Sequence, residues 1–129
     1  FRICEIQGSQ PMTFKLEREE DGTYMSESLD DLVKLVHEWG EERNLYENST
    51  AMAQTLKAMS EMGELADNIL KGRYERAQDD IGDVMVCLIH VARLIDSDMG
   101  KCLSISYNDI KDRKGYFSSN GGFVKEGDV

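Results

Sequence analysis

The sequence contains little of several residue types, and each shortage excludes a class of protein. Only one proline, Pro11, occurs in 129 residues, so helices can run uninterrupted from residue 12 onward. The three cysteines are widely spaced and form no Cys-x-x-Cys pair, which favours buried thiols in a reducing compartment over a disulfide framework or a zinc site. No apolar run reaches the roughly 18 residues that a membrane span needs.

Positive charge is also scarce. The chain has 15 Lys and Arg against 25 Asp and Glu, a formal net charge of −10. A nucleic-acid backbone is therefore not expected as a partner, because phosphate binding needs a basic surface. The length and the 40% hydrophobic content predict a single core. The first residues lack the layout of a signal peptide, so we expect a cytoplasmic protein without membrane contact.

From about Ser26 onward, apolar residues recur at intervals of three and four, which indicates helices. Ser28, with Asp31 three residues later, marks the first start, and Lys71-Gly72 marks the end of the second helix. The third helix is apolar almost all round after Asp83 and is expected to be central. The four predicted helices cover about 28–44, 50–71, 75–96 and 101–114. The apolar stripe predicted for the second helix is Leu56, Met59, Gly63, Ala66 and Leu70.

The two ends of the chain have different patterns. Residues 1–25 alternate like strands around a turn at 8–11 and are expected to form a short β-hairpin or extended arm. Beyond Gly115 we expect a loop with a short extended end at 123–125. The predicted fold class is all-α, a four- to five-helix bundle over residues 26–129.

Two pairs of carboxylates occur at helical spacing: Glu61 with Glu64, and Asp80 with Asp83. Residues three apart share a helix face, so each pair repels itself unless something compensates. If the second and third helices pack antiparallel, the pairs face each other, and two magnesium ions would neutralise the four charges. Oxygen ligands suit magnesium, with manganese as an alternative. The open alternative is that all four acids lie solvated on the surface.

Gly63 and Gly82 fall inside the two acidic motifs. Each costs about 1 kcal/mol of helix propensity relative to alanine. We therefore expect both glycines to permit a close approach of the two helices.

The order of these motifs resembles a known family. Glu61-x-x-Glu64, a gap of fifteen residues, Asp80-x-x-Asp83 and the later segments 111–115 and 122–125 are similar to the MazG-like branch of the all-α nucleoside triphosphate pyrophosphohydrolases. The resemblance covers roughly residues 26–125. It implies magnesium-dependent cleavage of a nucleoside triphosphate between the α and β phosphates, with the acidic quartet as metal ligands.

The resemblance also implies roles for individual residues. Glu61 or Glu64 is favoured as the base toward water, and the sequence does not separate ligand from base. This chain departs from the family at Ser60 and Asp80, where relatives often have Glu. A late group is expected to bind phosphates: Asn108, Lys111, Arg113, Lys114 and Lys125. On spacing alone, the Lys and Arg residues at the end of the fourth helix are better explained as ordinary complementation of the helix dipole.

A nucleobase pocket is predicted around Trp39, the single tryptophan, with His37 and Asn44 nearby. The alternative is that Trp39 belongs to the core, because it lies on the apolar stripe of its helix. His90 is expected to be structural, although its place two turns beyond Asp83 would let it reach a phosphate or a partner subunit.

Two other functions remain open from the sequence. One is a non-catalytic acidic helical protein that binds a basic partner. The other is a relative within the same superfamily, a dUTPase-like enzyme or a phosphoribosyl-ATP pyrophosphohydrolase. Four helices of this size bury a thin core, so a homodimer or homotetramer is expected.

Overall fold

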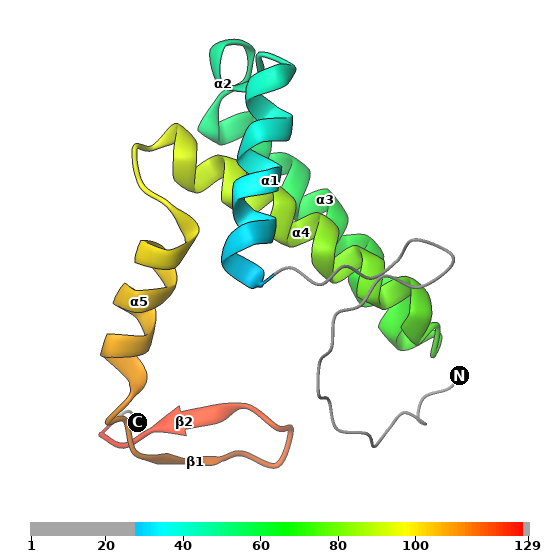
Figure 1. Ribbon diagram of the computed structural model, residues 1–129. Helices are drawn as coiled ribbons and strands as arrows, with labels where there is room; N and C mark the ends of the chain where they lie inside the picture. The colour runs from blue at the N-terminus through cyan, green and yellow to red at the C-terminus, as the bar shows by residue number, and fades with distance from the viewer. Residues whose placement is uncertain (1–27, 128–129) are drawn as a thin grey trace. The chain divides into compact units, whose positions relative to one another are not determined.

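The computed structural model describes residues 28–127, which are mostly helical and carry one small antiparallel sheet (Figure 1). The elements are α1 (Leu29–Glu42), α2 (Leu45–Asn48), α3 (Ala51–Leu70), α4 (Tyr74–Leu94), α5 (Met99–Ile110), β1 (Gly115–Phe117) and β2 (Phe123–Lys125). The chain divides after Met99 into a first unit with α1 to α4 and a second with α5 and the hairpin. The all-α prediction is confirmed at this level, and the arm predicted over residues 1–25 lies outside the described residues.

Side-chain caps set the starts of α1 and α3. The Ser28 Oγ accepts a hydrogen bond from the Asp31 N–H at 3.1 Å, and the Thr50 Oγ1 accepts one from the Ala53 N–H at 3.0 Å. Helix α3 ends at Leu70, and Gly72 follows its C-cap Lys71 with a φ of +72°, in the left-handed region that glycine adopts without strain. The helix starts predicted near residues 28 and 50 and the stop predicted at Lys71-Gly72 are therefore confirmed.

Three local predictions differ from the structure. The short helix α2 was not expected; it follows Asn44, whose left-handed φ of 57° turns the chain after α1. Helix α5 ends at Ile110 rather than near Lys114. The short extended end predicted at 123–125 is present as β2, but it pairs with β1 in a hairpin, with Gly115 opposite Lys125, where a loop was expected. A Cβ on Gly115 would lie 2.1 Å from the Val124 carbonyl oxygen, so only glycine permits this strand approach.

Helices α3 and α4 run antiparallel, joined at Gly72, and they form the most extensive contact in the first unit (Figure 1). Helix α4 also contacts α1 and α2, so its predicted central position is confirmed. Small residues at the interface, Ala58, Ala77 and Cys87, are buried and allow the two helices to pack closely.

The apolar stripe predicted for α3 is not the buried face of the helix. Leu56 and Met59 are 57% and 65% exposed. The less exposed face of α3 consists of Ala51, Gln54, Ala58, Glu61, Leu65 and Asn68, at alternating intervals of three and four. Half of these side chains are polar, so hydropathy alone selected the wrong face of the helix.

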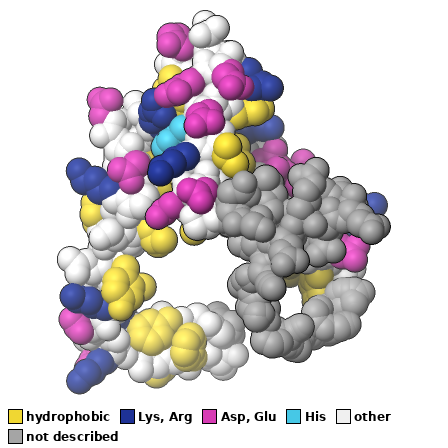
Figure 2. Space-filling model, in the orientation of Figure 1, with side chains coloured by type: hydrophobic (Ala, Val, Ile, Leu, Met, Phe, Trp, Pro, Cys, Tyr) yellow, Lys and Arg dark blue, Asp and Glu magenta, His cyan; other side chains and the backbone are white. Residues whose placement is uncertain are grey.

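The role expected for Gly63 and Gly82 was also wrong. A Cβ built on either residue meets no other atom within 4 Å, so neither glycine serves a close approach of α3 to α4 in the described structure. On the face of the first unit seen in Figure 2, acidic and basic side chains are interspersed, with hydrophobic side chains exposed among them. None of the helices within residues 28–127 is long and apolar enough to cross a membrane.

Candidate active site in the first unit

The α3–α4 interface contains carboxylates in two different settings. At its turn end, which we define by Asn68 and Asp80, the carboxylate is satisfied: Asp80 is 5% exposed, and its Oδ2 accepts a hydrogen bond from the Asn68 Nδ2 at 2.6 Å. A buried carboxylate needs such a donor, because removal from water disfavours its charged form. Asp80 is thus part of the packing between the two helices.

Away from the turn, the interface opens into a pocket. We call this the open end and define it by Lys57, Glu61, Asp83 and His90, which all line a pocket of about 630 Å³. Its remaining lining residues are Trp39, Leu45, Ala53, Gln54, Val86 and Cys87. The pocket therefore brings together one residue of each predicted acidic pair with the predicted nucleobase residue Trp39.

The two pocket carboxylates interact electrostatically. The Glu61 side chain is only 13% exposed and forms an ion pair with the Lys57 ammonium at 3.0 Å. Burial raises the pKa of Asp83, and the negative charges of Asp79, Glu61 and Asp80 raise it further, whereas Lys57 lowers it. A cation at this point relieves the repulsion, and Lys57 supplies one positive charge already.

The remaining member of the predicted quartet lies elsewhere. Glu64 is exposed on α3 and does not line the pocket. Within residues 28–127, no group of three or more His, Cys, Asp or Glu side chains is arranged to bind a metal ion unaided. Magnesium commonly takes only one or two protein carboxylates and completes its shell with waters and substrate phosphates. Glu61 and Asp83 fit that pattern, since both present oxygen ligands to the same pocket.

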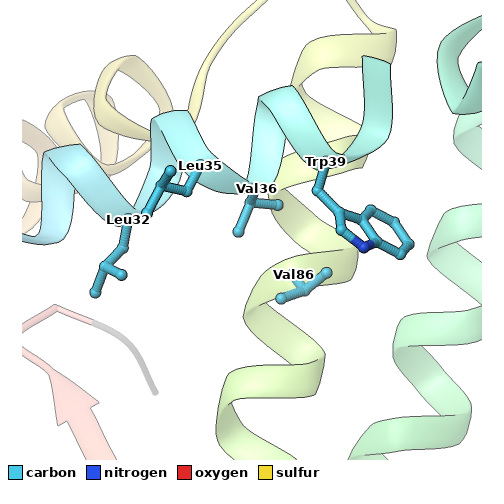
Figure 3. Close-up of a pocket in the computed structure, with 5 residues that line it drawn as sticks. All are labelled: Leu32, Leu35, Val36, Trp39 and Val86. Atoms are coloured by element: carbon cyan, nitrogen blue, oxygen red, sulfur yellow. The ribbon is translucent and has the colours of Figure 1, made fainter. Parts of the chain in front are cut away.

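An apolar groove continues from the pocket along α1. It has a volume of about 340 Å³ and is lined by Leu32, Leu35, Val36, Trp39 and Val86. Figure 3 shows Trp39 from α1 and Val86 from α4 at the same end of this groove, and both residues also line the polar pocket. Trp39 is 46% exposed, so it is not a core residue: it offers an aromatic surface at the junction of an apolar and an acidic region.

Trp39 belongs to an aromatic cluster that joins α1, α2 and α4. Its ring stacks on His90, with centroids 5.9 Å apart, and His90 meets the edge of Tyr46 at 5.5 Å. The Tyr46 hydroxyl is hydrogen-bonded to the His90 Nδ1 at 2.7 Å. The Arg43 guanidinium lies 4.5 Å from the Trp39 ring centroid, and that of Arg93 lies 4.9 Å from the Tyr46 ring centroid. The cluster fixes one wall of the pocket.

The other two predicted nucleobase residues lie beside this cluster. His37 and Asn44 do not line the pocket. Asn44 makes the turn between α1 and α2, and its carbonyl oxygen accepts a hydrogen bond from the Asn48 side chain at 2.8 Å. Burial lowers the pKa of His37, and the positive charge of Arg93 lowers it further.

The predicted phosphate-binding residues belong to the second unit. Arg113, Lys114 and Lys125 line a pocket of about 530 Å³, together with Asp109, Asp112 and Glu126. Arg113 forms an ion pair with Asp109 at 2.8 Å. Asn108 lines a separate pocket with Ile105, Ser106 and Asp109, and Lys111 lines neither. Three of the five predicted residues therefore share one pocket, in which acids balance the cations.

Sequence reasoning missed Lys57, Gln54 and Tyr46 and left His90 as structural. Lys57 had a signal, because it precedes Glu61 by four residues and such pairs meet on a helix. Tyr46 had none, since its contact with His90 joins residues 44 positions apart through a turn that only the structure reveals.

Comparison with known proteins gives one informative similarity. A protein of Haemophilus phage HP1, described as an uncharacterized 18.2 kDa protein in the rep-hol intergenic region, is 39% identical over 75 residues. The match covers 57% of this chain and 46% of the phage protein, so the chain spans about half of that relative's length. No protein-family model and no solved structure matches the chain. The description of the phage protein states no activity, so a functional argument depends on the site itself.

Proposed function

We propose that the chain is a nucleoside triphosphate pyrophosphohydrolase, which cleaves its substrate between the α and β phosphates to a monophosphate and pyrophosphate with magnesium. The observation that carries the proposal is that Trp39, Glu61 and Asp83 line one pocket. An aromatic surface suits a nucleobase, and paired carboxylates suit a divalent cation that carries the phosphates. The order of the acidic motifs, which resembles the MazG-like family, supports the same activity.

The pocket assigns different tasks to its residues. Glu61 and Asp83 would hold magnesium, with manganese as an alternative, and the ion would supply polarisation of phosphoryl oxygens and a lower pKa of bound water. Glu61 is the better candidate for the general base, because Glu61 lines the pocket and Glu64 does not. Lys57, which lines the same pocket, is placed to contact a phosphate oxygen. Glu64 remains an outer member of the proposed acidic set, and its side chain must reorient to reach the pocket; Asp80, buried and hydrogen-bonded to Asn68, is given a packing role instead.

The cations of the second unit keep their proposed role as phosphate ligands. Arg113, Lys114 and Lys125 are the best candidates, because they share a pocket. Lys111 and Asn108 are proposed on the resemblance of their segment alone.

We also propose that the protein acts as a homodimer or homotetramer. Met52, Leu56 and Met59 are 67%, 57% and 65% exposed at positions that share one face of α3. Large apolar side chains gathered on one helix face favour a covering surface, and a second copy of the chain supplies one. Sedimentation equilibrium measures the mass directly, and a monomer at all concentrations would contradict this part of the proposal.

A substrate panel tests the activity. The protein is incubated with magnesium and each ribo- and deoxyribonucleoside triphosphate, including dUTP, and with phosphoribosyl-ATP, and the products are resolved by phosphorus NMR. Monophosphate with pyrophosphate supports the proposal. Diphosphate with inorganic phosphate contradicts it, and the absence of any product favours an acidic protein that binds a basic partner.

A further inference from the structure

His90 has hydrogen-bonding capacity that the fold does not use. It is 2% exposed, and its Nδ1 is paired with the Tyr46 hydroxyl at 2.7 Å. Its Nε2 is shielded from solvent and has no hydrogen-bond partner within residues 28–127. Buried polar atoms without partners are uncommon in native proteins and need an explanation. The contact with Tyr46 already joins α2 to α4, so a purely structural role accounts for Nδ1 and leaves Nε2 unexplained.

The hydrogen bond with Tyr46 determines which ring nitrogen carries the proton. A phenol O–H is a stronger acid than an imidazole N–H, so the favoured arrangement has Tyr46 donating to Nδ1. Burial raises the pKa of Tyr46, which keeps the hydroxyl protonated and able to donate. Burial also lowers the pKa of His90, which keeps the ring neutral. Nε2 therefore bears the single ring proton and acts as a donor.

His90 is also placed at a defined distance from the acidic part of the pocket. It follows Asp83 by seven residues on α4, which corresponds to two turns and about 10 Å along the helix axis, so both side chains face the same side. Both line the pocket, with Trp39 against the His90 ring. A nucleotide whose phosphates lay near Asp83 would extend its base past Trp39 toward His90, because all three residues line the same pocket. The part of the base that arrives there is the edge farthest from the sugar.

We propose that His90 selects the base: its Nε2–H donates a hydrogen bond to a carbonyl oxygen on the far edge of a nucleobase that lies against Trp39. The ligands it favours are 4-oxopyrimidines and 6-oxopurines, and those it disfavours are the matching amino bases, whose exocyclic N–H groups oppose its own. This inference rests on the proposed pyrophosphohydrolase function for one point, which is that the ligand of the pocket is a nucleotide. Tyr46 is a positioning residue, because it acts by fixing the His90 tautomer.

Two pairs of nucleosides test the binding step without any hydrolysis. Uridine and cytidine differ at the 4-position, and inosine and adenosine at the 6-position. Each is titrated into the full chain without metal, and the imidazole nitrogen resonances of His90 are followed by NMR. We expect a protonated Nε2 in the free protein. We also expect uridine and inosine to shift that resonance and to bind about tenfold more tightly than cytidine and adenosine, the difference of one hydrogen bond.

Variants separate recognition from packing. His90→Phe keeps an aromatic ring and removes the donor, so the tenfold preference should fall to about parity. Tyr46→Phe keeps Nε2 and frees the tautomer, so the preference should also weaken while a nucleoside still shifts the His90 resonances. His37→Phe is the matched control: the His37 Nε2 is also buried without a partner, but His37 does not line the pocket, so the preference should persist.

The outcomes distinguish this inference from the proposed function. Equal binding within both nucleoside pairs, or a protonated Nδ1, overturns the inference whatever the activity. If nucleosides alone bind too weakly to measure, the ratio of kcat/KM for UTP over CTP decides, and a ratio near one overturns it. If no nucleoside binds and no triphosphate is hydrolysed, both proposals fail. If His90→Phe does not fold, Tyr46→Phe and the wild-type ratio still decide.

Discussion

The turn end and the open end of the α3–α4 interface contain aspartates one helical turn apart in opposite circumstances. Asp80 is 5% exposed and accepts a hydrogen bond from Asn68, whereas Asp83 lines a pocket where burial and neighbouring negative charges raise its pKa. Spacing alone treats the two residues as a pair. Their surroundings separate them into a carboxylate that the fold uses and one that remains available for chemistry.

The largest expected effect is on turnover. Asp83→Asn should lower turnover of a nucleoside triphosphate by about 100-fold or more, because it removes a charged oxygen ligand from the pocket. Its thermal midpoint should be unchanged or slightly higher, since the substitution removes a carboxylate that the fold disfavours. Turnover is measured by phosphorus NMR and stability by thermal unfolding.

Asp79→Asn is the matched control for this prediction. It removes a negative charge that raises the pKa of Asp83, but Asp79 is exposed and does not line the pocket, so most of the turnover should remain. Equal losses of turnover in the two variants would indicate that the loss comes from the change in net charge and not from a specific role of Asp83. Glu64→Gln extends the comparison: the family resemblance predicts a loss of turnover, and a loss would show that this exposed side chain joins the site in the complex.

The second prediction concerns stability at the turn end. Asn68→Ala should lower the free energy of unfolding by about 1–3 kcal/mol, because it leaves the buried Asp80 carboxylate without its donor. The control is Asp67→Ala, which removes a surface ion pair with Lys71 and should cost at most about 1 kcal/mol. Urea unfolding measures both. The double variant Asn68→Leu/Asp80→Leu should recover much of the loss, and equal costs for the two single variants would contradict a structural role for Asp80.

The third prediction uses two glycines that differ in their neighbours. A Cβ on Gly40 would lie 2.9 Å from the Tyr46 ring, which is anchored to His90, whereas a Cβ on Gly82 meets nothing within 4 Å. Overpacking outweighs the gain in helix propensity at Gly40, for a net loss of about 1 kcal/mol. Gly82→Ala should instead gain up to about 1 kcal/mol. Thermal and urea unfolding measure the sign of the stability change in each variant. A loss of stability in Gly82→Ala would indicate that a partner covers this surface.

Local chemistry explains how much of the fold the sequence predicts. Ser28, Thr50 and Gly72 mark helix ends through interactions within a few residues, and those boundaries were confirmed. The apolar stripe of α3 did not identify its buried face, because Leu56 and Met59 are hydrophobic and yet are exposed. Which face is buried depends on the partner helix, and hydropathy along one helix does not record it.

The sequence predicted part of the candidate site, as it did part of the fold. Helical spacing identified Glu61 and Asp83, and both line the pocket. It did not separate them from Glu64 and Asp80, because sequence spacing gives the face of a helix and not the depth of a side chain in the interface. The cluster of Trp39, Tyr46 and His90 depends on how α2 returns the chain to α4, and nothing local encodes that contact.

The fourth prediction concerns pH and should have the smallest effect. Burial lowers the pKa of both His37 and His90 below the ordinary value of 6.5. The positive charge of Arg93 lowers the pKa of His37 further, whereas the negative charges of Glu41 and Asp98 raise it. The charge of His37 also lowers the pKa of His90. The folded protein therefore holds both rings neutral, while the unfolded chain takes up protons first. Stability is complete above pH 6.5 and falls as the pH drops from there toward the lower folded values.

Asp83, which belongs to the open end with His90, has a pH effect of the opposite sign. Because the pKa of Asp83 is raised, the folded state takes up this proton before the unfolded chain does, so Asp83 favours folding as the pH falls. This effect begins at a lower pH than that of the histidines, nearer the ordinary value of 3.8 for an aspartate, and it relieves the repulsion in the pocket. Thermal midpoints are therefore compared from neutral pH to just below 6.5, where the histidines dominate. His37→Phe/His90→Phe should flatten the decline, and Asn68→Ala should shift the whole curve without changing its slope. A wild-type midpoint that stays flat through this range would contradict the burial of neutral imidazoles at the open end, and with it the tautomer on which base selection by His90 depends.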